Sequence, residues 1–366
     1  MQPGPPIRHT FSPGPGAAIR TIAATVVLAA VTGWLLVIGK DFLLPIVIAV
    51  ISVYVLTAAS AWLGRQPVIG RLPEIARRSF VLLGFVGVIT VFGSVVVSTA
   101  QELQTRLPLY IGNLRRMVEE TAASFGASLP EDWAARTMAA LPPVSLQDLL
   151  SLLLSSLGSL AGTIFMVVIY AMFLMSERAG FAHKIDAAFP DDRAALTHDT
   201  VRRINRSIGD YLAIKTLINI VLAVMCLAIL LVFGVDFALF WAIVIGLLNY
   251  IPYVGSYLGV AFPVMLTLAQ TGSVGVTLLV TALLILVQTW VGNVLEPRVV
   301  GRKVNMSPFV VLVTLTFWTL LWGIPGAILS VPLTSMIAIV LAAFPQTRPI
   351  AVLLAEDVSA FEERQA

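Results

Sequence analysis

Charged side chains are scarce in this chain, and their scarcity excludes an ordinary water-soluble protein. Of the 366 residues, 12% are charged and 58% are hydrophobic, whereas soluble domains carry roughly 25% charged residues. The mean hydropathy is +0.94. The formal net charge of +3 is small, and the sequence contains no nucleic-acid-binding motif. The composition therefore predicts a protein of the lipid bilayer with no nucleic-acid partner.

Cysteine and histidine are also nearly absent. Cys226 is the only cysteine and lies in an apolar run, which excludes a disulfide framework and a thiolate metal site. His9, His183 and His198 are too far apart in the sequence to indicate a metal cluster, and each is interpreted as a polar loop residue. Residues 33–40 have five residues between their glycines, where a P-loop has four. We therefore expect no metal, no cofactor and no enzymatic activity.

Long apolar runs separated by short charged links organise the first part of the chain. The predicted elements are a disordered tail at residues 1–18 and membrane helices at 19–38, 42–63 and 79–100, with region 19–100 acting as a scaffold. The link after the second helix carries four arginines against one acidic residue, Glu74. The positive-inside rule therefore places this link and the N-terminus in the cytoplasm.

A polar stretch separates the third and fourth membrane helices. In residues 101–148, apolar side chains recur at helical spacing with charges between them, which predicts an extracytoplasmic helical segment. The fourth membrane helix follows at 149–175. Residues 176–210 are predicted to form a cytoplasmic amphipathic helix that lies along the membrane surface before a fifth membrane helix begins near Leu212. Lys215 is interpreted as a residue whose ammonium reaches the headgroups.

Two later apolar runs are interrupted by helix-breaking residues. The first break, at residues 247–259, contains Asn249, Pro252 and Gly255, and the second lies at 322–327. Backbone groups freed by such breaks are tolerated in a membrane only beside a polar cavity. One unbroken helix over residues 237–270 would be ~50 Å long, whereas the hydrocarbon core is ~30 Å thick. We therefore predict two broken, re-entrant hairpins with arms of about a dozen residues, each half a span.

Together these elements predict an all-α polytopic membrane protein with about eight membrane segments. The loop at 292–308 carries Arg298, Arg302 and Lys303, and it is cytoplasmic only if the broken run before it is a hairpin. Helix plus hairpin then occurs twice with opposite orientation. This order predicts an inverted repeat in the C-terminal half, a transport region at 211–344 and a cytoplasmic tail at 345–366. Eight spanning helices, two of them kinked, are the alternative.

Motifs at and after the breaks resemble a known family. They are NYIPYVGSYLG at 249–259, EPRVVG at 296–301 and WGIPGAILSVPLTSM at 322–336. In these residues the chain resembles the AI-2E family of bacterial membrane proteins, also called the PerM-like permeases. The resemblance implies a multi-pass protein of the bacterial inner membrane. It also implies export of the quorum-sensing signal autoinducer-2, and sodium/proton antiport in some members.

The residues at the breaks suit a site for a small polar and largely uncharged solute, because amide and hydroxyl groups gather there. The predicted substrate-pathway residues are Asn249, Tyr250, Pro252, Tyr253, Gly255, Ser256, Tyr257, Gln288, Asn293, Gly323, Pro325 and Gly326. The predicted coupling or gating residues are Glu296, Arg298 and Asp236. For Glu296 and Arg298, a structural ion pair or a helix terminus at the cytoplasmic surface is an equally open interpretation.

Two classes of function therefore stay open. A secondary transporter would export a small polar solute such as autoinducer-2, or exchange sodium for protons. A non-transporting scaffold would instead use residues 101–147 as a docking surface. The membrane helices before residue 149 carry few polar groups and no internal break, as expected of a fixed frame, so we expect a homo-oligomer in the lipid bilayer.

Overall fold

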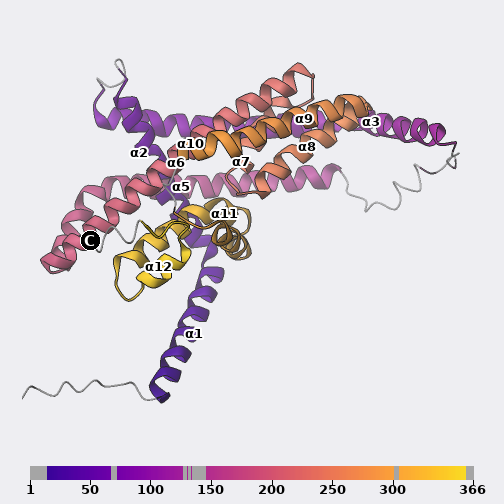
Figure 1. Ribbon diagram of the computed structural model, residues 1–366. Coiled ribbons are helices and arrows are strands. Elements are labelled where there is room, and N and C mark those ends of the chain that lie inside the picture. Colours follow the sequence, from indigo (N-terminus) through magenta and orange to yellow (C-terminus); the bar gives the residue numbers. More distant parts are fainter. Residues whose placement is uncertain are drawn as a thin grey trace, which may run out of the picture. The chain divides into compact units, whose positions relative to one another are not determined.

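The structure is a computed structural model that describes residues 15–66, 72–126, 130, 133, 146–300 and 305–359. These residues form helices and no strands (Figure 1), which confirms the predicted all-α class. Residues 1–14 of the tail predicted at 1–18 lie outside the described residues, as does most of the link at 127–145. The chain divides into two units, Met1–Leu44 and Pro45–Ala366, and each is described by itself.

The first unit contains α1, Pro15–Ile38. This helix begins four residues before the predicted boundary at 19, so residues 15–18 are helical rather than part of a tail. Helix α2, Lys40–Gly64, begins in the same unit and lies mostly in the second.

Three long helices in the second unit join segments that the sequence predicted separately. Helix α3, Glu74–Ser124, runs through Pro108, so the third membrane helix and its polar extension are one element. Helix α5 is Leu146–Ala188 and α6 is Asp191–Val232. The predicted surface helix and fifth membrane helix are not separated, because α6 is unbroken and Gly209 is the one glycine within it.

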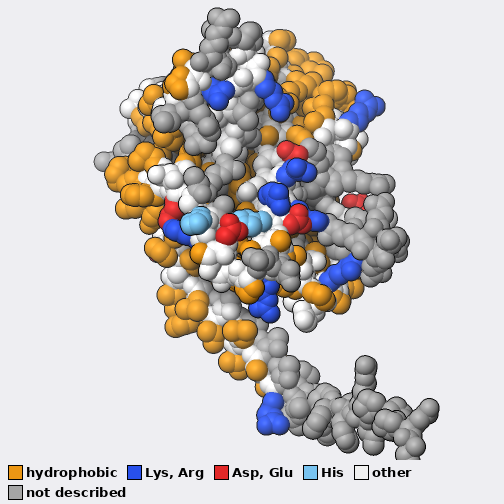
Figure 2. All heavy atoms as spheres, turned by 90° about the vertical axis from the view of Figure 1, so that its left-hand side faces the viewer, with side chains coloured by type: hydrophobic (Ala, Val, Ile, Leu, Met, Phe, Trp, Pro, Cys, Tyr) orange, Lys and Arg blue, Asp and Glu red, His pale blue; other side chains and the backbone are white. Residues whose placement is uncertain are grey.

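Charged side chains gather near the junction of α5 and α6. Glu177 pairs with Lys184, Asp186 with His198 and Asp199 with Arg203. Figure 2 shows basic, acidic and histidine side chains together on this face, with hydrophobic side chains around them. His183 and His198 lie in these helices, so their interpretation as loop residues is wrong.

By length and composition, six helices in the described part of the chain could cross a membrane. They include Lys40–Thr57, Ser79–Ser124, Arg193–Val232, Val254–Thr271, Val274–Val299 and Pro308–Ala343. Shorter apolar helices occur at Val26–Ile38, Phe165–Glu177 and Ala238–Leu248. The chain is therefore a multi-pass membrane protein. A total of eight segments stays a prediction.

The core of the second unit forms where α7, Ala238–Leu248, α8, Val254–Thr271, and α9, Val274–Trp290, pack with α6. Figure 1 shows these helices together. Side chains one turn apart on α6 (Ile218, Leu222, Cys226, Leu230) meet a matching row on α9 (Val280, Leu284, Val287). Helical spacing of apolar residues thus supplies one buried face to each helix.

The first break turns the chain back on itself. A Cβ at Gly255 would lie 1.7 Å from the backbone oxygen of Leu248, so α7 and α8 touch directly beside the turn. At their other ends, the Gln270 side chain donates to Gly234 O and accepts from Asp236 N, each at 2.8 Å. Both ends of this hairpin therefore lie together.

Its second arm, α8, has 18 residues, about 27 Å, so the prediction of half-span arms is wrong for α8.

The second break lies in α11, Pro308–Ala343, at Gly323 with φ 66° and ψ −143°. Trp318 Nε1 donates to Thr334 Oγ1 at 3.1 Å, and Leu315 packs against Ala327, so the two halves of α11 lie side by side. Ile251 at the tip of the first hairpin joins the same cluster. The halves, residues 308–322 and 324–343, are roughly 23 and 30 Å long, again longer than predicted.

Residues after the second hairpin fold back onto its beginning. Helix α12, Arg348–Leu354, packs against α11. Asn305 Nδ2 donates to Asp357 O at 2.6 Å, and Asn305 Oδ1 accepts from the backbone N–H groups of Glu356 and Asp357. We call residues 355–357 the strap. The described part of the predicted tail at 345–366 is thus folded, because one amide side chain satisfies three backbone groups.

Candidate functional site

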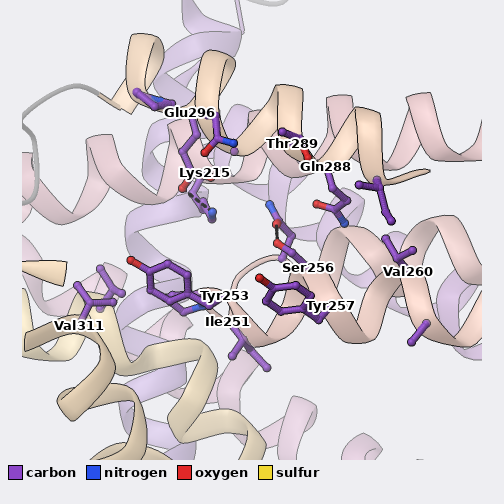
Figure 3. Close-up of a pocket in the computed structure, with 18 of the residues that line it drawn as sticks. Lys215, Ile251, Tyr253, Ser256, Tyr257, Val260, Gln288, Thr289, Glu296 and Val311 are labelled. Atoms are coloured by element: carbon purple, nitrogen blue, oxygen red, sulfur yellow. Dashed lines mark hydrogen bonds and ion pairs between the residues drawn. The ribbon is translucent and has the colours of Figure 1, made fainter. Parts of the chain in front are cut away.

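A cavity of about 830 Å³ lies beside the first break. Residues of α6, of the first break and of α8 line it. Further lining residues come from α9 and the helical turns that follow it, from α11 and from the strap. Figure 3 shows Gln288, Thr289 and Glu296 reaching the cavity from one side and Tyr253 and Tyr257 from the opposite side. The volume falls in the range of pockets for small molecules, roughly 300–1,000 Å³.

Eight predicted site residues lie in the wall of this cavity. They are Asn249, Pro252, Tyr253, Ser256, Tyr257, Gln288, Asn293 and Glu296. The structure thus brings residues from the first hairpin together with residues some forty positions later on α9 and beyond it. Contact of these side chains with a solute stays a prediction.

A polar network fixes the tip of the first hairpin to α6. Asn249 Nδ2 donates to Asn219 Oδ1 at 2.8 Å, and Ser256 Oγ donates to Asn249 Oδ1 at 3.3 Å. The Tyr250 and Thr216 hydroxyls lie 2.6 Å apart, so Tyr250 contacts α6 and is absent from the cavity wall. Both asparagines are buried, and buried amides are costly unless hydrogen-bonded. This network therefore holds the open backbone of the break in place.

Two tyrosines of the first hairpin present their rings to the cavity. Tyr253 is 51% exposed and Tyr257 is 78% exposed. Tyr253 has φ 61°, one of two positive values at non-glycine residues in the described part of the chain. A bulky residue in this region is strained, and such strain concentrates at functional sites. The backbone strain at Tyr253 is thus the energetic cost of holding this residue directly before α8.

A partly buried ion pair lies in the wall of the cavity. Lys215 Nζ of α6 donates to Glu296 Oε1 at 2.6 Å, with side-chain exposures of 7% and 30%. Both residues line the cavity. The interpretation of Lys215 as a snorkelling residue is therefore wrong, because its ammonium meets a carboxylate inside the protein. Glu296 is ion-paired, as one interpretation held, but Lys215 is its partner.

The helix that carries Glu296 changes geometry just before it. A π-helical turn, η2, covers Val291–Leu295 between α9 and α10, Glu296–Val300. Gly292, Asn293 and Glu296 all reach the cavity wall from this stretch. Since π turns within α-helices often mark functional sites, η2 is a second local irregularity beside the cavity.

The other predicted site residues do not line this cavity. Gly255 and Gly326 are packing residues, since a Cβ would lie 1.7 and 2.0 Å from the backbone oxygens of Leu248 and Trp318. Gly323 and Pro325 form the second break away from the wall, where α11 contributes Val311 and Val331 instead. Arg298 is also absent from the wall.

Asp236 lies outside the cavity in a contact between α3 and the first hairpin. Its carboxylate accepts from Arg106 Nη1 at 2.5 Å and from the Tyr110 hydroxyl at 2.7 Å. Asn113 Nδ2 donates to Gln270 O at 2.6 Å nearby. We call this set the α3 clamp. Asp236 therefore does not line this cavity, and its role in coupling stays a prediction.

Sequence reasoning missed several residues of the wall. They include Tyr211, Lys215, Thr289, Val311, Val331 and Glu356. Lys215 had a usable signal, because an ionisable residue inside an apolar helix is a functional suspect. Glu356 had none, since its place depends on the strap. In the described part of the chain, no group of three or more His, Cys, Asp or Glu side chains could hold a metal ion.

Comparisons with known proteins agree on one family. A model of the AI-2E family transporters matches residues 22–346. The AI-2 transport protein TqsA of Escherichia coli (strain K12) is 28% identical over 321 residues, which cover 87% of this chain and 90% of TqsA. A putative transport protein of Haemophilus influenzae is 29% identical over 282 residues, or 76% and 80% of the two chains. A putative transport protein of Borreliella burgdorferi is 35% identical over 178 residues, 48% of this chain and 49% of that protein.

Proposed function

The chain belongs to the AI-2E transporter family, and from this premise we propose that it is a secondary transporter of the bacterial inner membrane that exports a small polar solute. The observation that carries the proposal is the cavity beside the first helix break. Its wall combines amide, hydroxyl and charged side chains with a mostly apolar lining. A few placed polar groups in an apolar pocket are typical of small-molecule sites.

The membrane setting explains why the break and the cavity occur together. Non-helical backbone at membrane depth is stable only where protein or a water-filled cavity satisfies it. Here Asn249, Tyr250 and Ser256 bond to neighbours around the break. Discontinuous helices of this kind bind the solute in many secondary transporters, so the break supports a transport role for this cavity.

We extend the proposal to an inverted repeat. Helix α6 with the α7–α8 hairpin forms its first half, and α9 with the α11 hairpin forms the second. The paired ends of the first hairpin at Gly234 and Gln270 support a segment that enters and leaves by one face. In this arrangement both termini are cytoplasmic, and residues 211–344 form the transport region.

Autoinducer-2 is the first solute to test. TqsA, 28% identical to this chain, is named an AI-2 transport protein. In proteoliposomes loaded with autoinducer-2, the purified protein should release the signal faster than protein-free liposomes. A rate equal to the protein-free rate, with correctly inserted protein, would contradict this solute. Failure with every small polar solute tested would favour the scaffold instead.

Sodium/proton antiport is the second candidate, and the Glu296 carboxylate in the cavity wall favours it. A carboxylate in a membrane pathway can exchange ions and protons. If sodium drives proton movement in proteoliposomes and Glu296→Gln abolishes it, antiport becomes the favoured function. Its absence, with solute export intact, would leave export as the function.

We also propose a homo-oligomer braced by the helices before residue 149. None of the most apolar stretch of α3 is buried within one chain. Lipid or further copies of the protein must therefore cover it. Native mass spectrometry in detergent should give the mass of two or more copies of the 39.3 kDa chain. A monomer with full flux would remove the reason for this assembly.

A further inference from the structure

We propose that Lys215 and Glu296 together bind the head group of a zwitterionic amino acid whose side chain is apolar or aromatic. This inference rests on the proposed transport function and narrows its solute class. It depends on the bonding capacity of the ion pair, the charge balance of the pair and the apolar part of the cavity lining.

The ion pair leaves both partners with unused hydrogen-bonding capacity. An ammonium has three donors and a carboxylate has two acceptor oxygens. Among the residues that the structure describes, the contact between Lys215 Nζ and Glu296 Oε1 is the one bond that each charged group makes. Gln288 Nε2, on the same side of the cavity, is buried without a partner in the described region. These groups can therefore bind a solute without breaking existing contacts.

Stability gives a poor reason for placing this pair in a cavity wall. The desolvation of two charges roughly cancels their attraction, so a buried ion pair is often no better than apolar side chains. The pair nevertheless lines the cavity rather than the core that Ile218 and Leu222 form on the same helix. A role in recognising a solute explains that position.

The charge balance of the pair selects the solute. A cation beside Glu296 meets the repulsion of Lys215, and an anion beside Lys215 meets that of Glu296. A zwitterion avoids both conflicts, because its carboxylate can face the ammonium while its own ammonium faces the carboxylate. An α-amino acid carries these two charges close together, as the 2.6 Å contact between Lys215 and Glu296 requires.

The remainder of the cavity is suited to an apolar body. Tyr253 and Tyr257 lie opposite the polar side (Figure 3), and several aliphatic side chains also line the cavity. These include Val260, Val264, Ile285, Val311 and Val331. Aromatic rings pack favourably against apolar and aromatic groups. The solute therefore carries its charges at one end and an apolar or aromatic side chain at the other.

Three matched compounds test the proposal. Phenylalanine has both charges, 2-phenylethylamine lacks the carboxylate and 3-phenylpropanoate lacks the ammonium. Equilibrium binding to the purified full-length protein in detergent at pH 7 should show phenylalanine at least about tenfold tighter than either analogue, because each analogue leaves one charge-assisted hydrogen bond unmade.

Variants of the pair should exchange these preferences. Lys215→Met leaves a lone carboxylate and should favour 2-phenylethylamine, whereas Glu296→Gln should favour 3-phenylpropanoate. The double variant Lys215→Met/Glu296→Gln removes both charges of the pair together and leaves neither partner alone, so it remains informative if the single variants fold poorly. It should bind phenylalanine no better than the analogues. Thr316→Val on α11, outside the cavity wall, is the matched control and should retain the native preference.

Equal binding of the three compounds to the native protein would overturn the inference. An unchanged preference in the double variant would do the same. Phenylalanine binding without phenylalanine flux in proteoliposomes would contradict the transport function and leave the binding site intact. Flux of autoinducer-2 without phenylalanine binding would contradict the inference alone.

Discussion

At the scale of single residues, Asn249 connects the first break to α6. Asn249→Ala removes the donor to Asn219 Oδ1 and the acceptor for Ser256. Asn219 is 4% exposed, so its unpaired carbonyl costs about 1–3 kcal/mol. Because the network holds the break at the cavity wall, we expect solute flux to fall about tenfold or more, with membrane insertion unchanged.

Flux per inserted molecule measures this effect, with the amount of protein in the membrane determined by immunoblot. Ser94→Ala is the control, since this exposed serine donates only to Val91 O of its own helix. Native flux from Asn249→Ala at native expression would move the site away from the break.

Gly255 lies at the closest approach of α7 and α8. In Gly255→Ala the new Cβ would lie 1.7 Å from Leu248 O, so the hairpin must open or shift. Overpacking of this kind costs about 1–3 kcal/mol. We expect a lower thermal unfolding temperature in detergent than for the native protein.

Gly275→Ala on α9 is the matched comparison. The nearest atom to its new Cβ, Ser273 Oγ, is 4.0 Å away, and alanine favours a helix over glycine by up to about 1 kcal/mol. This variant should be neutral or stabilised. Equal behaviour of the two variants would show that α7 and α8 do not touch at Gly255.

At the scale of elements, the α3 clamp joins the polar half of α3 to the base of the first hairpin. Asp236→Asn removes its ion pair with Arg106 and weakens its bond with Tyr110. Because Asp236 is 14% exposed and Arg106 43%, the stability loss should be modest, about 1 kcal/mol. Amide hydrogen exchange in residues 101–124 should become faster.

Glu119→Gln provides the control for this experiment. It removes an exposed ion pair with Arg115 that lies entirely within α3. Exchange at the base of the hairpin, residues 234–236 and 270–272, should rise in Asp236→Asn and stay native in Glu119→Gln. Faster exchange confined to α3 in both variants would mean that the clamp does not couple the two elements.

One side chain, Asn305, makes three hydrogen bonds with the strap. Asn305→Ala loses all three bonds to residues 356 and 357, whereas Asn305→Asp keeps acceptors for the two N–H groups. We expect cleavage by a protease after Glu356 to be fastest in the alanine variant and intermediate in the aspartate variant. The same rate in all three proteins would show that the strap is held by other contacts.

At the scale of the whole molecule, the proposed inverted repeat predicts on which side of the membrane each loop lies. In a Cys226→Ala background, a cysteine replacing Lys303 should react with an impermeant thiol reagent from the cytoplasm. A cysteine replacing Ser273 should react from outside. Labelling of position 303 from outside would favour kinked spanning helices over re-entrant hairpins.

Much of the architecture could be predicted from local patterns. Apolar runs predicted α9 and the membrane segment within α6, and Pro252 with Gly255 predicted the first break, because these features act within a few residues. Eight residues of the cavity wall were found in the same way. Arm lengths were less accurate, since packing allows α8 to continue for 18 residues.

The features that could not be predicted depend on contacts between residues far apart in the sequence. Lys215 was assigned to the headgroups because nothing near it in the sequence indicates Glu296 as its partner. Asp236 was assigned to coupling because the pattern does not show Arg106 beside it. Glu356 reaches the cavity through the strap and Asn305. Each of these pairings depends on the tertiary fold, and local sequence patterns do not show which distant residues the fold brings together.

The separation of Lys215 from Glu296 also affects how the protein is made. The partners are 81 residues apart, so at roughly 5–20 residues per second the ribosome needs about 4–16 s to supply the carboxylate. During that interval the ammonium of α6 has no partner, and its cost in the bilayer is at most about 2.5–3.5 kcal/mol, the value for a charge at a helix centre. The apolar side chains between Leu217 and Val232 must offset this cost before the partner arrives. Their hydrophobicity thus serves the insertion machinery as well as the finished core.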